Sequence, residues 1–321
     1  MMVSRCHGSL SRTATGAVSA RRAGSWRFGL PGLLFILAVT CAAAAFIEEN
    51  QSAVAMAAPA QGYSLAIKDG LLTATFGEMT DDDVLIAAIP DLIVKGVQSV
   101  YLRNAPVEDL ALFEKMPELR ALDLAGTRVR DIRVLAAITG LQSLNLQFLQ
   151  ISDLRPLARL SGLRSLNIGG TEVEDLGPLR NLVNLQSLVV AVTRVADVRP
   201  LAQMIQMLSL DLGNTWVSNI RPLAGMTNLR ELRLNGTLVE KIQPLGGMTN
   251  LIELDLSATN VSDIRPLARL INLRTLNMEG TQVANVAPLT GLTSLHTVAL
   301  GGSLVTDTTP LDHITGLEIS R

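Results

Sequence analysis

The sequence predicts an α/β solenoid, in which short parallel β-strands line a concave face and short helical or 3-10 turns cover the convex face. Three observations lead to this prediction. A 22-residue pattern recurs along most of the 321-residue chain, each copy contains an alternating Leu-x-Leu segment, and most copies carry a proline at one later offset. A single copy cannot bury its own leucines, whereas stacked copies can.

The copies follow one another at intervals of 22 residues without any insertion, and each opens with an apolar residue. The opening residues are Val97, Leu119, Leu141, Leu163, Leu185, Met207, Leu229, Leu251, Leu273, Leu295 and, for a partial last copy, Leu317. We therefore predict ten full copies and a partial last strand over residues 97–321.

Within a copy, the Leu-x-Leu alternation predicts a short strand with one buried face. Strands of successive copies then pair in a parallel sheet, with neighbouring strands about 4.8 Å apart. The recurring proline suits the first position of a short helical turn. It stands at Pro156, Pro178, Pro200, Pro222, Pro244, Pro266, Pro288 and Pro310.

Residues 63–96 precede the regular copies and have a different pattern. The segment YSLAIKDGLLTATF alternates on both sides of its Asp69-Gly70 pair, which is typical of a β-hairpin. Thr80 and three consecutive aspartates follow, and acidic residues favour the positive end of a helix. We predict that this hairpin and helix form an N-terminal cap over the first leucine layer.

The first 47 residues contain five arginines and no acidic residue, and they end in an uncharged run over residues 28–47. This order is typical of a secretory signal peptide, but the run is also long enough to span a bilayer as an uncleaved membrane anchor. Residues 48–62 predict a linker. Either reading places the rest of the chain outside the cytoplasm. We therefore expect an exported protein that is periplasmic, secreted or anchored to the outer side of the cytoplasmic membrane.

The pattern LxxLxLxxTxVxDIxPLxxLxx resembles the internalin-like, 22-residue subclass of bacterial leucine-rich repeat proteins, from Val97 to Leu317. The resemblance implies a leucine-rich repeat fold and a cell-surface or secreted binding protein. It also implies a turn in which an Asn side chain bonds backbone groups of neighbouring copies. This chain has Thr there, and a hydroxyl that donates and accepts can satisfy some of those groups. The predicted structural ladder is Thr127, Thr171, Thr193, Thr215, Thr237, Thr259 and Thr281, and Leu149 interrupts it.

Composition and motifs disfavour several classes of function. Without the five N-terminal arginines, 29 acidic residues face 22 basic ones, and a net charge of about −7 disfavours nucleic-acid binding. The three histidines are scattered and both cysteines precede the repeats, so we expect no metal and no cofactor. A recurring aspartate, often followed two residues later by arginine, is interpreted as a turn former rather than a calcium ligand. Since the familiar catalytic motifs are missing, we expect no enzyme.

The outward-facing strand positions are small and polar, and they become mildly acidic toward the C-terminal half. This face is either a solvated surface or a recognition surface. Apolar residues enter the loops after the strands: Phe148 and Val192 stand where most copies have Gly, Ala or Asn, and Trp216 and Leu238 follow the recurring threonine. They are either chance variation in a tolerant loop or an apolar strip along one rim. The candidate partner-binding residues are Phe148, Val189, Asp211, Trp216, Arg233, Leu238 and Asp255.

These observations predict an exported, non-enzymatic scaffold that binds a protein or peptide through its concave face and the adjacent rim. The alternative is a membrane-anchored structural envelope protein that self-associates through its uncapped C-terminal repeat. Membrane contact is expected only through residues 28–47, if they are not cleaved.

Overall fold

The computed structural model describes residues 62–321. The expectations for a signal peptide or anchor over residues 1–47, and nearly all of the predicted linker, lie outside these residues. Within residues 62–321, no helix is both long and apolar enough to cross a lipid bilayer. The division into a cap and ten copies stays a prediction about domain boundaries.

One sheet of thirteen strands runs through residues 62–321, with the strands in sequence order. The first two strands pair antiparallel, and each later strand pairs parallel with the strand before it. The strands are β1 (Tyr63–Lys68), β2 (Leu71–Phe76), β3 (Ser99–Tyr101), β4 (Ala121–Asp123), β5 (Ser143–Asn145), β6 (Ser165–Asn167), β7 (Ser187–Val189), β8 (Ser209–Asp211), β9 (Glu231–Arg233), β10 (Glu253–Asp255), β11 (Thr275–Asn277), β12 (Thr297–Ala299) and β13 (Glu318–Ser320).

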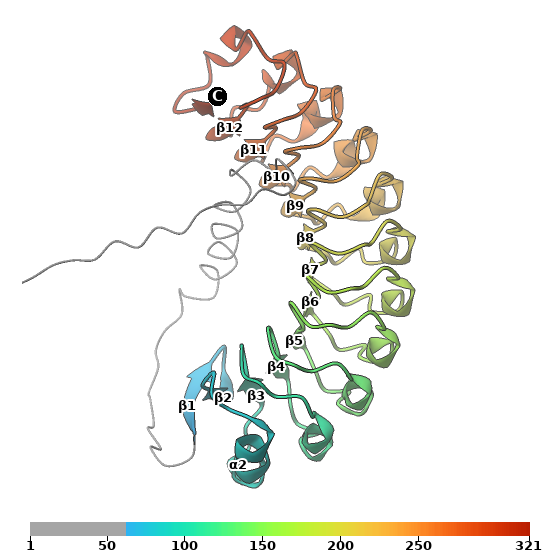
Figure 1. Cartoon of the computed structure of the whole chain (residues 1–321). Helices are drawn as coiled ribbons and strands as arrows, with labels where there is room; N and C mark the ends of the chain where they lie inside the picture. The colour runs from blue at the N-terminus through green and yellow to red at the C-terminus, as the bar shows by residue number, and fades with distance from the viewer. Residues whose placement is uncertain (1–61) are drawn as a thin grey trace, which may run out of the picture. The chain divides into compact units, whose positions relative to one another are not determined.

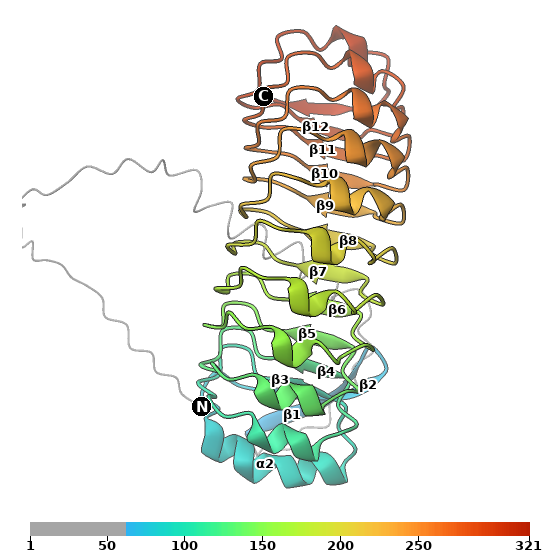
Figure 2. The ribbon, with the colours of Figure 1, turned by 90° about the vertical axis from the view of Figure 1, so that its right-hand side faces the viewer.

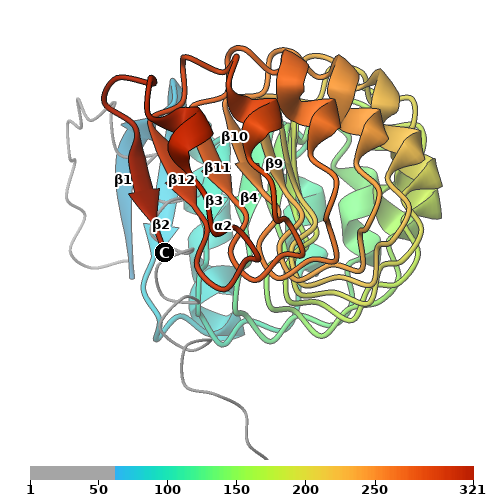
Figure 3. The ribbon, with the colours of Figure 1, turned by 90° about the horizontal axis from the view of Figure 1, so that it is seen from above.

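A short 3-10 helix follows each strand from β3 to β12 and returns the chain across the outer side of the stack. These helices are η1 (Ala111–Lys115), η2 (Arg133–Ala137), η3 (Arg155–Leu157), η4 (Gly177–Leu179), η5 (Arg199–Leu201), η6 (Arg221–Gly225), η7 (Gln243–Gly247), η8 (Arg265–Arg269), η9 (Ala287–Leu289) and η10 (Thr309–Leu311). The strands line the concave side of this unit and the 3-10 helices its convex side (Figures 1 and 3). Figure 2 shows the convex side, with the 3-10 helices stacked copy on copy.

The core lies between these two layers and consists of the recurring aliphatic positions. In one central copy, Leu254 and Leu256 at the strand and Val261, Ile264 and Leu267 on the return path are all buried. Burial of each such side chain stabilises the fold by about 1.5–3 kcal/mol relative to exposure. Because a layer is covered only by its neighbours, the copies depend on one another for stability. The predicted solenoid fold is confirmed.

A hairpin and a helix precede the first regular copy. The hairpin turns at Asp69 and Gly70, which both have positive φ angles of 50° and 76°. Helix α2 (Asp82–Val94) starts after Asp81, whose carboxylate accepts the Val84 N–H at 3.0 Å. In Figure 1, α2 lies in the outer row beside η1, where later copies have their 3-10 helices. Its buried residues, Leu85, Ala88, Ile89 and Leu92, belong to the same core as the repeats.

Candidate interaction surface

The last residue of six of the ten strands from β3 to β12 closes the following turn through its own side chain. Its carboxylate or amide oxygen accepts the backbone N–H two residues later, at 2.8–3.1 Å. The acceptor residues are Asp123, Asn145, Asn167, Asp211, Asp255 and Asn277. Such Asx turns fix the exit of the chain from the sheet. The polar residues at the ends of these strands therefore have a structural role that sequence analysis missed.

Three residues after the end of each strand from β3 to β12, the backbone takes a left-handed conformation. Glycine, Asn or Ala holds this position in most copies, namely Asn104, Gly126, Gly170, Asn214, Gly236, Ala258, Gly280 and Gly302. The other two copies hold Phe148 and Val192, with φ angles of 63° and 59°. A left-handed conformation costs an L-residue about 1–2 kcal/mol, and a β-branched residue is a genuine outlier there. The two intruding side chains noted in the sequence are thus also strained.

The threonines of the predicted ladder are all buried, and each makes the same hydrogen bond. The Thr237 hydroxyl donates to the Leu234 carbonyl at 2.6 Å, and the other six donate to the carbonyl three residues earlier at 2.6–2.8 Å. These bonds lie within one turn. The expectation that the hydroxyls replace bonds to neighbouring copies is therefore corrected: each threonine closes its own turn. Leu149, which interrupts the column, is buried as a purely apolar residue.

Recurring side-chain bonds between copies come instead from an asparagine ladder on the loops that precede the strands. The side-chain amide of Asn250 donates to the Thr227 carbonyl of the previous copy at 2.9 Å. Equivalent bonds run from Asn184, Asn228 and Asn272. The sequence signal was present, since these residues stand 22 or 44 apart immediately before the opening leucines. Their role could not be distinguished from that of an exposed loop residue.

Five large apolar side chains are exposed in the loops that follow β3–β12. One, Leu304, is 56% exposed and stands apart in the copy that begins at Leu295, and the other four belong to earlier copies. Phe148 is 55% exposed, Val192 57%, Trp216 58% and Leu238 55%. The segments that carry Val192 and Trp216 run side by side, because the Val192 N–H donates to the Gly213 carbonyl and the Trp216 N–H to the Val195 carbonyl. We call these four residues the apolar rim. They come from copies that begin at Leu141, Leu185, Met207 and Leu229, so they follow the stacking direction.

Leu238 of the apolar rim also borders an open groove of about 790 Å³. Charged and amide side chains form much of the remaining wall, including Asn219, Arg221, Glu240 and Lys241. The groove lies between the copies that begin at Met207 and Leu229. It offers a partner polar contacts next to an exposed leucine.

The remaining candidate residues lie side by side on four adjacent strands. Val189 pairs with Asp211, Asp211 with Arg233, and Arg233 with Asp255 in the parallel register. Val189, Arg233 and Asp255 are partly exposed, with the Arg233 guanidinium 3.8 Å from the Glu253 carboxylate. The structure thus brings the concave candidates together on β7–β10.

Asp211 departs from the expectation of an available partner-binding residue, because it is only 7% exposed. Burial raises the pKa of its carboxyl, while the Gly213 N–H and the nearby Arg233 partly oppose that rise. Its carboxylate accepts the Gly213 N–H at 2.8 Å. The Asx turn holds the carboxylate against the backbone of its own copy, but it does not by itself explain the burial, because Asp255 makes the same bond and is partly exposed.

The charge of the concave face changes along the stack. The outward strand positions of β5–β7 are Ser143, Ser165, Ser187, Asn145, Asn167 and Val189, and β8 adds Ser209 and the buried Asp211. From β9 to β11 the same face carries Glu231, Glu253, Asp255 and, just beyond β11, Glu279, against Arg233 alone. A ligand on this face therefore meets a nearly uncharged half followed by an acidic half.

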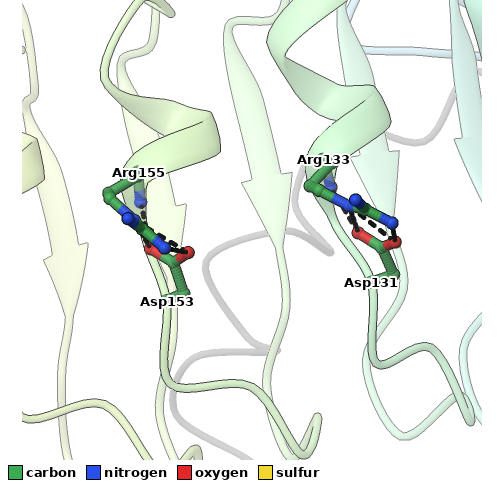
Figure 4. A network of polar contacts seen from close by, with 4 residues as sticks. All are labelled: Asp131, Arg133, Asp153 and Arg155. Atoms are coloured by element: carbon green, nitrogen blue, oxygen red, sulfur yellow. Dashed lines mark hydrogen bonds and ion pairs between the residues drawn. The ribbon is translucent and has the colours of Figure 1, made fainter.

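The recurring aspartates before the 3-10 helices have a turn-forming role. In Figure 4 the Asp131 and Asp153 carboxylates each accept the backbone N–H and the guanidinium of an arginine two residues later, Arg133 and Arg155. The Arg133 side chain holds the pKa of Asp131 down to about 2, and Arg265 does the same for Asp263. In the part of the chain that the structure describes, no three His, Cys, Asp or Glu residues gather as a metal site would require.

Comparison with known proteins supports the assignment of leucine-rich repeats. Residues 227–269 match the family model described as leucine-rich repeats, two copies. No curated protein matches the chain. Leucine-rich repeat proteins generally act as non-enzymatic scaffolds for protein–protein interaction.

Three solved structures illustrate the likeness. An internalin, InlF, of Listeria monocytogenes has 26% sequence identity and a TM-score of 0.63, with 75% of this chain and 76% of that chain covered. Internalin C2 of the same species has 32% identity and a TM-score of 0.55, covering 56% and 79%. A plant receptor kinase ectodomain of Arabidopsis thaliana, solved in complex with Casparian strip integrity factor 2, has 16% identity and a TM-score of 0.60, covering 72% and 33%; it shares the fold.

The 22-residue pattern, the stacked parallel strands and the likeness to internalin C2 over most of that protein's length lead to one conclusion. This chain belongs to the internalin-like leucine-rich repeat proteins.

Proposed function

We propose that this protein is an exported scaffold that binds a protein or peptide through its concave face and the apolar rim. The observation that carries the proposal is the exposure of Phe148, Val192, Trp216 and Leu238 along the stacking direction. Large apolar side chains in line on a surface favour partner binding, and Trp is among the residues that contribute most to binding energy.

The comparison structures support a protein or peptide as the kind of partner. Two plant receptors with the same fold were solved in complexes, one with Casparian strip integrity factor 2 and one, a peptide hormone receptor, with RGF2. At 16% identity each, they support the fold's capacity for such ligands and give no ligand for this chain.

Export is proposed from the N-terminal sequence. Five arginines precede the uncharged run over residues 28–47, an order that fits a signal peptide or an anchor. Intact mass of the protein from cell fractions tests this part. A shortened species outside the cytoplasm is expected after cleavage, and a full-length membrane species after anchoring. Full-length protein in the cytoplasm alone would contradict export.

Binding is tested by capture on the immobilised full-length protein, with Trp216→Ala beside the wild type. The scaffold function predicts a specific partner that the Trp216→Ala variant retains at least tenfold more weakly. Ile271→Thr is the matched control, because Ile271 is also exposed but stands on the loop before a strand. A protein that forms stable oligomers and captures nothing else would favour the alternative, a self-associating envelope protein.

A further inference from the structure

The copy that begins at Leu185 lacks two adjacent features of the repeat. At the end of its strand, Val189 replaces the Asp or Asn that most copies use to close the turn. Three residues later, Val192 occupies the left-handed position. Phe148 is a second bulky residue at that left-handed position, two copies earlier. The first change removes the side-chain acceptor that closes the turn, and the second places a β-branched residue in a strained backbone conformation. Each change therefore lowers the stability of the fold.

Val189 leaves a backbone donor available. In the copies on either side, Asn167 accepts the Gly169 N–H at 2.9 Å and Asp211 accepts the Gly213 N–H at 2.8 Å. Within residues 62–321, the equivalent N–H of Ala191 has no such acceptor, and Ala191 is partly exposed. The copies with Tyr101, Arg233 and Ala299 share this change, but none of them also carries a bulky left-handed residue. An open N–H beside apolar side chains is a place for an incoming carbonyl oxygen.

Burial in the core does not offset the strain at Val192 and Phe148, because each of these residues is more than half exposed. The Phe148 ring lies over Gly170 of the next copy, where an added methyl group would come within 2.3 Å of the ring. Asn104 and Asn214 take the same place over Gly126 and Gly236, so the turn also accommodates a small polar residue. Strained residues that the fold does not need are most often kept for function.

The charges on the face indicate what kind of ligand fits. Around Val189, the outward residues of β5–β8 are serines and asparagines, together with the buried Asp211. On the C-terminal side, Glu231, Glu253, Asp255 and Glu279 outnumber Arg233. A complementary ligand therefore has an uncharged, apolar part and a basic part, in that order along the stack.

We infer that β5–β8 and the apolar rim bind one extended segment of a partner protein. Its uncharged apolar residues lie against Phe148, Val192 and Trp216, a backbone carbonyl accepts the Ala191 N–H, and a flanking Lys or Arg lies over the acidic part of β9–β11. This inference rests on the proposed scaffold function and deepens it by assigning the site and the ligand chemistry.

The test uses a displayed library of random 12-residue peptides, selected on the immobilised full-length protein. The enriched peptides are expected to share an apolar stretch next to Lys or Arg. Their affinity is then measured for the triple variant Phe148→Asn/Val189→Asn/Val192→Asn, which gives each position a residue that other copies use. We expect at least a tenfold loss of affinity with an unchanged or higher Tm. Ile271→Thr is expected to change neither.

Acidic enriched peptides, no enrichment, or peptides that bind the triple variant as tightly as the wild type would each overturn the inference. The scaffold function is judged separately. If a folded partner is captured in a Trp216-dependent way while the triple variant still binds it fully, the inference fails and the scaffold function stands. If neither a peptide nor a folded partner binds, both fail.

Discussion

The ring of Phe148 lies across Gly170 in the following copy, so closely that a Cβ atom at Gly170 would come within 2.3 Å of the ring carbon Cδ1. Gly170 also has a φ of 69°, which L-residues rarely adopt. The two residues are therefore coupled: the Phe148 ring requires glycine at position 170, whereas the smaller Val192 is followed by Asn214 in the next copy. This relationship places an aromatic side chain on the surface at a defined position along the stack.

Gly170→Ala is expected to destabilise the protein by about 1–3 kcal/mol, because it adds both left-handed strain and a clash with the ring. The measurement is the free energy of unfolding from urea titration. Gly291→Ala is the control, since no atom lies within 4 Å of a methyl group there and its φ is not positive. Equal effects of the two substitutions would show that Phe148 does not constrain its neighbour.

Thr237→Val is expected to destabilise the fold by about 0.5–1.5 kcal/mol, because it removes the hydroxyl that donates to the Leu234 carbonyl, while that carbonyl keeps the backbone N–H of residue 237. Valine has nearly the same shape, so the change isolates the hydrogen bond. Thr237→Ser keeps the hydroxyl and should retain part of the lost stability. The prediction fails if serine and valine variants unfold at the same urea concentration.

The Asp131–Arg133 pair predicts that the stability of the fold decreases at acidic pH. Asp131 has a pKa of about 2, below the ordinary value, chiefly because the Arg133 guanidinium and backbone N–H bond its ionised form. A lowered folded-state pKa gives a contribution to stability that is present above about pH 4 and is lost as the pH falls toward 2. Arg133→Ala should raise the pKa of Asp131 in a carboxyl NMR titration. An unchanged pKa would mean that the exposed arginine does not hold this geometry in solution.

Asn250→Ala is expected to cost about 0.5–1.5 kcal/mol, because the amide bonds the Thr227 carbonyl of the preceding copy at 2.9 Å. The measurement is again the free energy of unfolding. Asn260, in the exposed loop after β10, has no side-chain hydrogen bond within residues 62–321, so Asn260→Ala serves as the control. If both variants unfold alike, the asparagine ladder contributes nothing measurable.

The repeat period was enough to predict the solenoid, because every core position recurs at a fixed offset and only stacking can bury it. The left-handed turn position was visible as a column of Gly, Asn and Ala, which made Phe148 and Val192 stand out. The direction of individual loop side chains could not be predicted. Thr237 bonds within its own turn, and Asp211 folds back onto the Gly213 N–H, because local backbone geometry decides which groups a short side chain reaches.

Around β5–β8 the repeat departs from its own pattern at a cost to the stability of the fold, and we attribute this departure to the binding of a partner. Thermal unfolding of Val192→Asn tests it most directly, since Asn214 shows that asparagine fits this backbone. Relief of left-handed strain predicts a variant that is more stable by about 1 kcal/mol, with a correspondingly higher Tm. A variant that unfolds at a lower temperature than the wild type would contradict the account, because Val192 would then be serving the fold itself.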